Sequence, residues 1–411
     1  MTRLPEPSVE VNVFFAYDLM QLTIGIFMKP TLSDLLPNLM RPVGAGIPVV
    51  STGSGEVFAL QCLHYKNFEQ SRLDPTQIDP LWRDSWTQIQ NTQVVMIGVP
   101  LDTGAGIRRG AAYGPQGIRR KLLELDGYKK LLKNRTVLDL GDILVNPHLL
   151  HDEMLSDSQK LACQEAMYPQ AGQELRKQLA VSALSQLKQV LLSLLATRPD
   201  LRFFIMGGDH SVAWPVSEAL AARYPGTLAI VQPDAHTDLL PARLGVKYCF
   251  GTWSYHANDL LGRGGKLVQL GIRQSGRDKA HWESTMDVKQ YWASEIRARP
   301  EQEVIDELVV HLKTRGVKHL YFSNDIDGTD ESEAAATGTP ANEGLSSEFL
   351  LKVIRRLGDE FELVGADIME VAPDLGHDLA ASEATCELAA RYSLACLEVQ
   401  IKSRQSRSKS G

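Results

Sequence analysis

The chain has 411 residues, of which 44% are hydrophobic and 23% are charged, and it contains 32 glycines and 20 prolines. This composition excludes disordered, collagen-like and coiled-coil proteins, and the length permits one large α/β domain or two or three smaller ones. The net charge of −7 argues against a nucleic-acid-binding protein, which usually carries a basic face. The five cysteines are scattered and form no CxxC pair, which indicates a reduced, cytoplasmic chain and not a disulfide framework or zinc site.

The first part of the chain, residues 1–90, is proline-rich and irregular, and we expect it to form an N-terminal extension that packs on the main domain or on a neighbouring subunit. Residues 11–28 are apolar, but polar residues interrupt them, whereas a membrane span needs roughly 20 mostly apolar residues. A signal-peptide pattern is not clear either. This segment is therefore either an amphipathic arm or precedes a true chain start at Met28 or Met40.

Residues 91–401 alternate between short β-rich apolar runs and stretches of helical period, which predicts βαβ units in one domain. The predicted fold is a three-layer α/β sandwich whose central, mostly parallel sheet is covered by helices on both faces. Ligands of such sheets bind beyond the carboxyl ends of the strands. The basic tail, residues 402–411, is expected to be disordered. The predicted strands are 94–99, 137–140, 203–206, 228–232, 267–270, 319–322 and 363–366, and the predicted helices are 116–125, 173–196, 212–222, 302–315, 347–357 and 382–399.

Three polar clusters each follow a predicted strand. They are GGDHS at 207–211, DAHTD at 234–238 and NDID at 324–327. Any one of them alone is more often a glycine turn or a helix cap than a site. Three clusters at three strand ends are much harder to explain in that way, so the sequence predicts one shared binding site.

The acidic residues of these clusters favour metal binding. Asp234, His236 and Asp238 lie at i, i+2 and i+4, which places them on one face of an extended strand end, and the two aspartates of the third cluster repeat the spacing. Four carboxylates that point the same way repel one another unless a cation neutralises them. An oxygen-rich set with two imidazoles suits Mn, Ni or Fe, and two bridged ions account for six ligands better than one tetrahedral zinc. The predicted metal ligands are His210, Asp234, His236, Asp238, Asp325 and Asp327.

These motifs resemble those of the ureohydrolase family, which includes arginases and agmatinases. The family pattern of GGDHS, then DAHxD, then a strand that ends in S/T-x-D-x-D occurs here in the same order. The resemblance spans roughly residues 93–400, apart from 148–171, and implies an arginase-like fold. Further agreement lies in the loop 101–115, in GIR at 271–273, in TGTP at 337–340 and in GADIMEVAP at 365–373.

The resemblance also implies roles for single residues. Two divalent ions are expected, Mn²⁺ or else Ni²⁺: His210, Asp234, Asp238 and Asp325 would hold one, Asp234, His236, Asp325 and Asp327 the other, with Asp234 and Asp325 bridging. Glu370 matches the acidic residue that pairs with a guanidinium group, through two parallel charge-assisted hydrogen bonds. A bridging hydroxide would then attack the guanidino carbon and release urea and an amine. Asp209 and Asp238 are candidates to orient ligands or to carry a proton to the leaving nitrogen.

One stretch departs from the family pattern. Agmatinases have His-Gly-Thr after DAHxD, where this chain reads CFGTW at 249–253, and phenylalanine cannot carry a proton. His256 is a candidate replacement, although an exposed spectator histidine fits as well. Phe250 and Trp253 are candidate substrate-binding residues that would shrink the pocket and stack on a small cation, or they are core packing. The third cluster also differs, with Asn324 where the family usually has Phe and Asp330-Glu331 in place of Asp-Pro.

The predicted function is hydrolysis of the guanidino C–N bond of a small compound, with free guanidine slightly favoured over agmatine. One alternative is a formimidoylglutamase-type hydrolase that releases formamide, since that branch also lacks the histidine and has Ser-Gly-Thr there. Another is a non-catalytic paralogue, against which the six intact ligands argue, because a dead site need not keep clustered charge. The resemblance implies a cytoplasmic homotrimer or homohexamer, and no nucleic-acid or membrane partner is expected.

Overall fold

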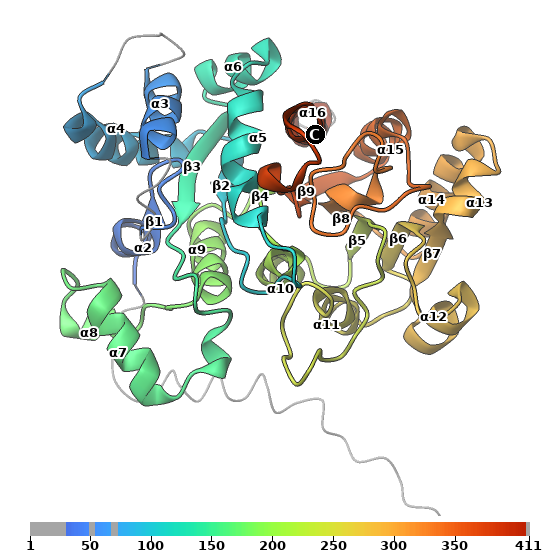
Figure 1. Cartoon of the computed structure of the whole chain (residues 1–411), viewed down its shortest axis with the longest axis horizontal. Helices are drawn as coiled ribbons and strands as arrows, with labels where there is room; N and C mark the ends of the chain where they lie inside the picture. The colour runs from blue at the N-terminus through green and yellow to red at the C-terminus, as the bar shows by residue number, and fades with distance from the viewer. Residues whose placement is uncertain (1–29, 49–53, 67–72, 408–411) are drawn as a thin grey trace, which may run out of the picture.

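The computed structural model describes residues 30–48, 54–66 and 73–407, with side chains as far as Lys402. A nine-stranded sheet with the order β1-β3-β2-β4-β9-β8-β5-β6-β7 forms its centre (Figure 1). All strand pairs are parallel except β1 with β3, so the predicted mostly parallel sheet is confirmed. The strands are β1 Met40–Arg41, β2 Val94–Gly98, β3 Val137–Ile143, β4 Arg202–Met206, β5 Leu228–Pro233, β6 Leu267–Ile272, β7 Lys289–Trp292, β8 His319–Asp325 and β9 Glu362–Met369.

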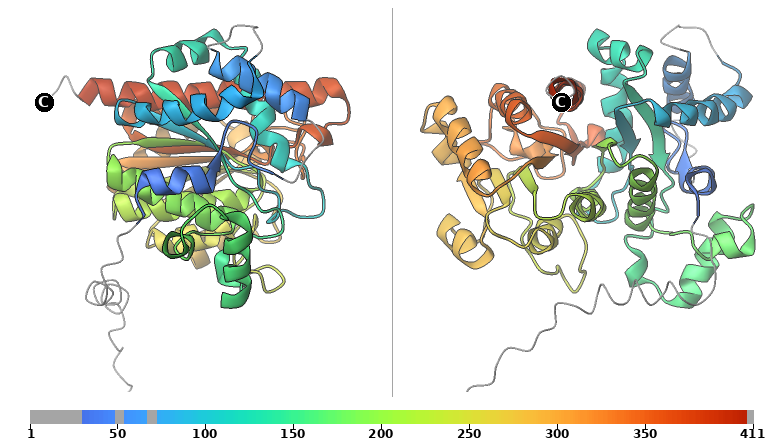
Figure 2. Two further views of the ribbon diagram at one scale, coloured as in Figure 1. Left: turned by 90° about the vertical axis from the view of Figure 1, so that its left-hand side faces the viewer. Right: turned by 180° about the vertical axis from the view of Figure 1, so that it is seen from behind.

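Helices cover both faces of the sheet, which lies between them when seen edge-on (Figure 2). One apolar core packs α2, α9, α10 and α11 on one face, and a second packs α5, α14, α15 and α16 on the other. The predicted three-layer α/β sandwich is therefore confirmed. The helices are α2 Leu32–Leu39, α3 Ser54–Tyr65, α4 Ile78–Ser85, α5 Gly114–Leu122, α6 Asp126–Lys133, α7 Asp157–Met167, α8 Gln173–Arg176, α9 Ala183–Thr197, α10 Ala213–Arg223, α11 Trp253–Leu260, α12 Lys279–Met286, α13 Ala293–Arg297, α14 Glu301–Thr314, α15 Ser347–Glu360 and α16 Leu379–Arg407.

The predicted strands are all present, because their residues are apolar and buried on both faces. Every residue of β2, β4, β5 and β6 is buried, as expected for a parallel sheet between two helical layers. The sequence did not predict β1 or β7. The first has only two residues, and the second reads KQYW, whose polar side chains do not resemble a buried strand.

The single predicted helix over 173–196 is wrong, because the structure has two helices there, α8 and α9. A non-helical segment separates the two helices, and Ser182 is the residue that precedes α9. The Ser182 backbone N–H and its hydroxyl both donate to Asp152 Oδ1, at 2.8 and 2.6 Å. A carboxylate from a distant turn thus fixes the start of α9, which periodicity within the helix cannot reveal.

The described part of residues 1–90 contains α2, α3, α4 and β1, elements that the sequence analysis did not predict. These elements cover the β3 edge of the sheet, where the Trp82 indole N–H donates to the Leu140 carbonyl at 2.8 Å. Residues 11–28, the predicted amphipathic arm, lie outside the described residues. At the other end, α16 continues to Arg407, into the stretch expected to be a disordered tail. Among the described helices, none has the length and apolar character that a membrane crossing requires.

Arg119 joins α5 to β3 through a buried ion-pair network. Its Nε and Nη2 donate to the two carboxylate oxygens of Asp139 at 2.8 and 2.9 Å, and its Nη1 pairs with Asp142. All three side chains are at most 2% exposed. One guanidinium is therefore shared by two carboxylates inside the fold.

We predict that Arg119→Met lowers the free energy of unfolding by about 3–5 kcal/mol, because it leaves two buried carboxylates without their cation. The matched control is Arg120→Met on the next residue, whose pair with Glu383 is partly exposed, and it is expected to cost about 0–1 kcal/mol. Urea unfolding of both variants measures the difference. Equal losses in the two variants would contradict this account of the network.

Candidate metal centre

The candidate site lies where the carboxyl ends of four neighbouring central strands meet, in the order β4, β9, β8 and β5. Short helical turns follow two of them, His210–Val212 after β4 and Ile326–Gly328 after β8. Each turn is capped by its own aspartate, because Asp209 accepts the Ser211 N–H at 3.0 Å and Asp325 accepts the Asp327 N–H at 2.9 Å. These turns carry His210 and Asp327, two of the predicted metal ligands.

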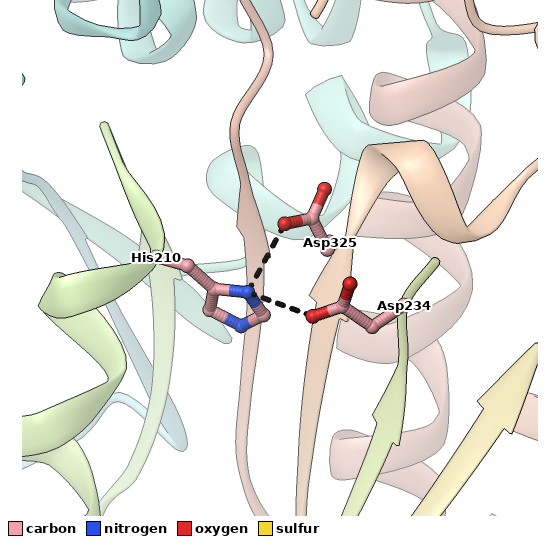
Figure 3. Close-up of side chains that lie close together, drawn as sticks. All are labelled: His210, Asp234 and Asp325. Carbon is pink, nitrogen blue, oxygen red and sulfur yellow. Dashed lines mark hydrogen bonds and ion pairs between the residues drawn. The ribbon is translucent and has the colours of Figure 1, made fainter. Parts of the chain in front are cut away.

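The first group of possible ligands surrounds the His210 imidazole. Its Nδ1 lies 3.1 Å from Asp325 Oδ2 and 3.3 Å from Asp234 Oδ2 (Figure 3). Asp238 Oδ2 is 3.5 Å from the same nitrogen. All four residues are buried. One nitrogen and three carboxylates therefore face a single point from three strands.

A second group surrounds His236, whose Nδ1 lies 3.0 Å from Asp327 Oδ2 and 3.6 Å from Asp234 Oδ1. Asp234 thus faces one group with Oδ2 and the other with Oδ1, as a carboxylate between two cations does. The second group does not include Asp325, whose Oδ1 accepts the Asp327 N–H, so the predicted bridging by Asp325 stays a proposal. The structure brings all six predicted ligands together.

Polar side chains that sequence reasoning did not single out hold these ligands in place. His210 Nε2 lies 3.0 Å from Ser323 Oγ, and the Ser323 hydroxyl in turn donates to Asp367 at 3.0 Å. With its proton on Nε2, the imidazole keeps the Nδ1 lone pair for a cation. On the other side, the Thr339 hydroxyl donates to Asp327 Oδ2 at 3.0 Å. Ser323 stands in the S-x-D-x-D motif, which was the available signal.

Trp253 contacts two of the predicted ligands, Asp238 and His210. Its indole N–H donates to Asp238 Oδ2 at 3.0 Å, and its ring centroid lies 4.6 Å from that of His210. The residue is fully buried. Its ring therefore offers no open face to a substrate, which favours the packing alternative for Trp253 over stacking on a small cation.

Phe250 and His256 lie in the loops beside the site. The half-buried Phe250 ring has the Arg243 guanidinium carbon 4.7 Å from its centroid, and its backbone N–H donates to the Gly104 carbonyl at 3.1 Å. His256 Nε2 lies 3.1 Å from both the Pro241 and the Lys247 carbonyl oxygens. Within the described residues, the contacts of His256 are with this loop and nearby aromatic rings, and not with the six predicted ligands.

Two candidate residues adopt a backbone conformation that is uncommon for residues other than glycine. Asp238 has φ 51° and Glu370 has φ 61°, both in the left-handed region. Glu370 is held there by its N–H, which donates to the Gly208 carbonyl at 2.8 Å. Its Oε1 also accepts the His210 backbone N–H at 2.9 Å. The end of β9 is thus tied to the turn that carries His210.

The crowded charges shift the pKa values of the site. Burial alone would lower the pKa of His236, but Asp327 and Asp234 raise it to about 12. Burial and the charge of Asp234 raise the pKa of Asp238 to about 8. Burial and the neighbouring aspartates also raise the pKa of Asp325 well above its ordinary value. Without a cation, the cluster therefore retains protons at neutral pH.

A model of the arginase family matches residues 92–396. The chain belongs to the arginase family. This confirms the resemblance inferred from the motifs, and it makes the protein an arginase-family hydrolase. Enzymes of this family use a binuclear divalent metal site and are typically oligomeric, and the two His/Asp groups could bind metal.

Several members of the arginase family are similar to this chain. Mitochondrial agmatinase of Gallus gallus is 30% identical over 298 residues, which are 70% of this chain and 76% of that protein. Proclavaminate amidinohydrolase of Streptomyces clavuligerus is 30% identical over 75% of this chain and 90% of its own length. Its solved structure matches with a TM-score of 0.60 and 28% identity, covering 76% of this chain and 93% of that one. Formimidoylglutamase of Bacillus subtilis matches with a TM-score of 0.60 and 25% identity, over 75% and 87%.

We predict that Trp253→Phe weakens metal binding by roughly 10- to 100-fold, because Asp238 loses the donor that orients it. Trp214→Phe is the matched control, since within the described residues the Trp214 indole N–H has no hydrogen-bond partner. Calorimetric titration of the metal-stripped proteins with Mn²⁺ provides the measurement. A similar loss in both variants would assign the effect to ring packing alone.

The stability of the metal-free protein should fall as the pH rises. His236 has a folded pKa of about 12, so its stabilisation is complete below about pH 6.5 and is lost as the pH approaches 12. The pKa of Asp238 is about 8 in the folded protein and 3.8 for the free side chain. The stabilisation from its protonated form therefore decreases above pH 3.8 and is lost as the pH rises through 8. Thermal unfolding of the chelated protein from about pH 6 to about pH 9 should show a falling midpoint. A flat or rising midpoint would contradict these charge assignments.

Proposed function

We propose that this protein hydrolyses the C–N bond of a small guanidino compound, with free guanidine favoured over agmatine, to give urea and ammonia or an amine. The observation that carries the proposal is the position of Asp234 between the two His/Asp groups. The buried carboxylate of Glu370 lies beside the first group, where it accepts the His210 backbone N–H. The similarity to agmatinase and proclavaminate amidinohydrolase supports the same reaction class.

Two divalent ions, Mn²⁺ or else Ni²⁺, fit the donor set of carboxylate oxygens and two imidazoles. In this proposal one ion is held by His210, Asp234, Asp238 and Asp325, and the other by Asp234, His236, Asp325 and Asp327. When bound, such a pair of ions makes a water molecule nucleophilic at neutral pH. The protein contributes the fixed positions of the ligands.

Glu370 is the proposed guanidinium-binding residue. A carboxylate can take a planar guanidinium through two parallel charge-assisted hydrogen bonds. Burial raises the pKa of Glu370 well above its ordinary value, and Asp325 and Asp209 reinforce the shift. A guanidinium cation would reverse this effect, because it stabilises the ionised carboxylate. Glu370 would thereby select a cation and fix its plane over the metal ligands.

Asp238 is the proposed proton carrier to the leaving nitrogen. It is a buried carboxylate of the candidate centre, with its Oδ2 3.5 Å from His210 Nδ1, and a carboxylate in such a position can accept and donate a proton. His256 donates to loop carbonyls, so we propose that it holds the loop of residues 241–247 in place of carrying a proton. Phe250, with Arg243 on its ring, fills the space beside Gly106, and this favours a short substrate over one with a long tail.

The remaining parts of the proposal concern the whole protein. Residues 91–401 would form the catalytic domain and residues 1–90 the extension, in a cytoplasmic homotrimer or homohexamer. A formimidoylglutamase-type reaction is the second candidate, favoured by Phe250 at the position of the agmatinase histidine and by the match to the Bacillus subtilis formimidoylglutamase structure. The non-catalytic alternative predicts no activity that a chelator could remove.

The deciding experiment measures products from the purified protein loaded separately with Mn²⁺ and Ni²⁺. The substrates are guanidine, agmatine, 4-guanidinobutyrate, arginine and formimidoylglutamate. Urea from guanidine is expected, and a chelator should abolish it until metal is restored. No urea from any guanidino compound with either ion would overturn the proposal, and formamide from the last substrate would support the second candidate.

Glu370→Gln should lower kcat/KM for the guanidino substrate by about 10- to 150-fold, because a neutral amide forms a weaker hydrogen bond to a guanidinium than a carboxylate does. Metal stoichiometry should stay unchanged, since Glu370 is not among the proposed ligands. Glu383→Gln, on the exposed face of α16, is the control and should keep full activity. Loss of bound metal in the Glu370 variant would contradict its role as a substrate residue.

A further inference from the structure

Three glutamines form a row inside the sheet. Gln232 on β5 lies directly opposite Gln269 on β6, which lies directly opposite Gln290 on β7. All three are fully buried. Buried amides in place of apolar side chains cost free energy unless every polar atom is paired, so this row calls for a function beyond packing.

The row is a chain of hydrogen bonds that runs in one direction. The Trp292 indole N–H donates to Gln290 Oε1 at 2.9 Å, and Gln290 Nε2 donates to Gln269 Oε1 at 2.7 Å. Gln269 Nε2 donates to Gln232 Oε1 at 2.8 Å. Finally, Gln232 Nε2 donates to Asp234 Oδ2 at 2.7 Å. Each link of the chain therefore donates in the direction of Asp234.

Fixed donors and acceptors determine this direction. The Ser254 hydroxyl donates to Gln232 Oε1 at 2.7 Å, so this oxygen accepts two hydrogen bonds and leaves the NH₂ group for Asp234. Gln269 Nε2 also donates to the Thr237 carbonyl at 2.6 Å, and a carbonyl can only accept. At the far end, an indole N–H can only donate. Reversing any amide would therefore break at least one bond.

The chain ends on the carboxylate that the two His/Asp groups share. Gln232 holds Asp234 Oδ2, while the His236 backbone N–H holds Asp234 Oδ1 at 2.6 Å. Each oxygen is fixed by one donor, which fixes the plane of the carboxylate and leaves lone pairs directed at the two groups. Donors in a chain also polarise one another, so the last N–H is a stronger donor than an isolated amide.

We propose that Gln232, Gln269 and Gln290 form a positioning ladder that orients Asp234 to bind both metal ions, an inference that rests on the proposed binuclear centre. The ladder sets the plane of the shared carboxylate before a metal arrives. Its influence decreases with distance from Asp234, in the order Gln232, Gln269, Gln290. A purely structural role predicts instead that all three act alike, because they are equally buried.

The test compares Gln232→Leu, Gln269→Leu and Gln290→Leu in the full-length, metal-stripped protein. Mn²⁺ binding is measured by calorimetry, the exchange coupling of the ion pair by electron paramagnetic resonance, and thermal unfolding without metal by calorimetric scanning. Wild type should bind two ions. Gln232→Leu should weaken the binding roughly 10- to 100-fold and reduce the coupled signal, Gln269→Leu less and Gln290→Leu least, with similar losses of thermal midpoint in all three.

Gln269→Glu serves as a second variant in case a leucine variant does not fold. It keeps the shape of the side chain, but an ionised carboxylate cannot donate to Gln232, so weaker Mn²⁺ binding than in Gln290→Leu is expected. Two ions in wild type with equal affinities in all variants would overturn the ladder and leave the proposed function standing. No metal binding in wild type would overturn both.

Discussion

The repulsion among buried carboxylates at the carboxyl ends of β5 and β8 is the constraint on which the site depends. Four buried carboxylates crowd around two imidazoles there, those of Asp234, Asp238, Asp325 and Asp327. The two histidines, even when protonated, balance only part of this negative charge. Positive charge has to enter this cluster, either as protons on the histidines and aspartates or as metal ions. The raised pKa values of His236 and Asp238 show that, without metal, protons supply part of this positive charge.

The surrounding structure prevents the cluster from relaxing away from this repulsion. The side chains of Trp253, Ser323, Thr339 and Gln232 each donate to or contact one of the crowded groups. They come from α11, from β8, from the loop at Thr339 and from β5, so no single loop can move a ligand aside. Hydrogen bonds of this kind orient the side chains that bind a metal. These hydrogen bonds restrain the ligand side chains. The exposed Arg243 and the half-buried Phe250 lie in the loops beside the site.

The sequence predicted the sheet and the six clustered residues because both follow from local patterns. Apolar runs such as 203–206 specify a strand, and the polar clusters follow directly in the sequence. The expected extended strand end that would align alternate aspartates is wrong, because Ile326–Gly328 forms a helical turn and Asp238 has φ 51°. The supporting residues could not be predicted in this way. Gln232 and Gln269 meet only because β5 and β6 pair in one register, and α9 begins after Ser182 because Asp152 reaches that residue from a distant turn. Partners of this kind are fixed by tertiary structure, which a single sequence does not reveal.

The place of β9 in the sheet has a consequence for how the protein matures. Although β9 is the last strand in the chain, it lies at the centre, between β4 and β8 (Figure 1). During synthesis from the N-terminus, the strands β1 to β4 and the strands β5 to β8 emerge as two separate halves that β9 must join. The group of Asp234, His236 and Asp327 comes from the second half alone, whereas His210 belongs to the first. One half of the centre can therefore assemble on the ribosome, but His210 reaches it only after the final strand has been inserted.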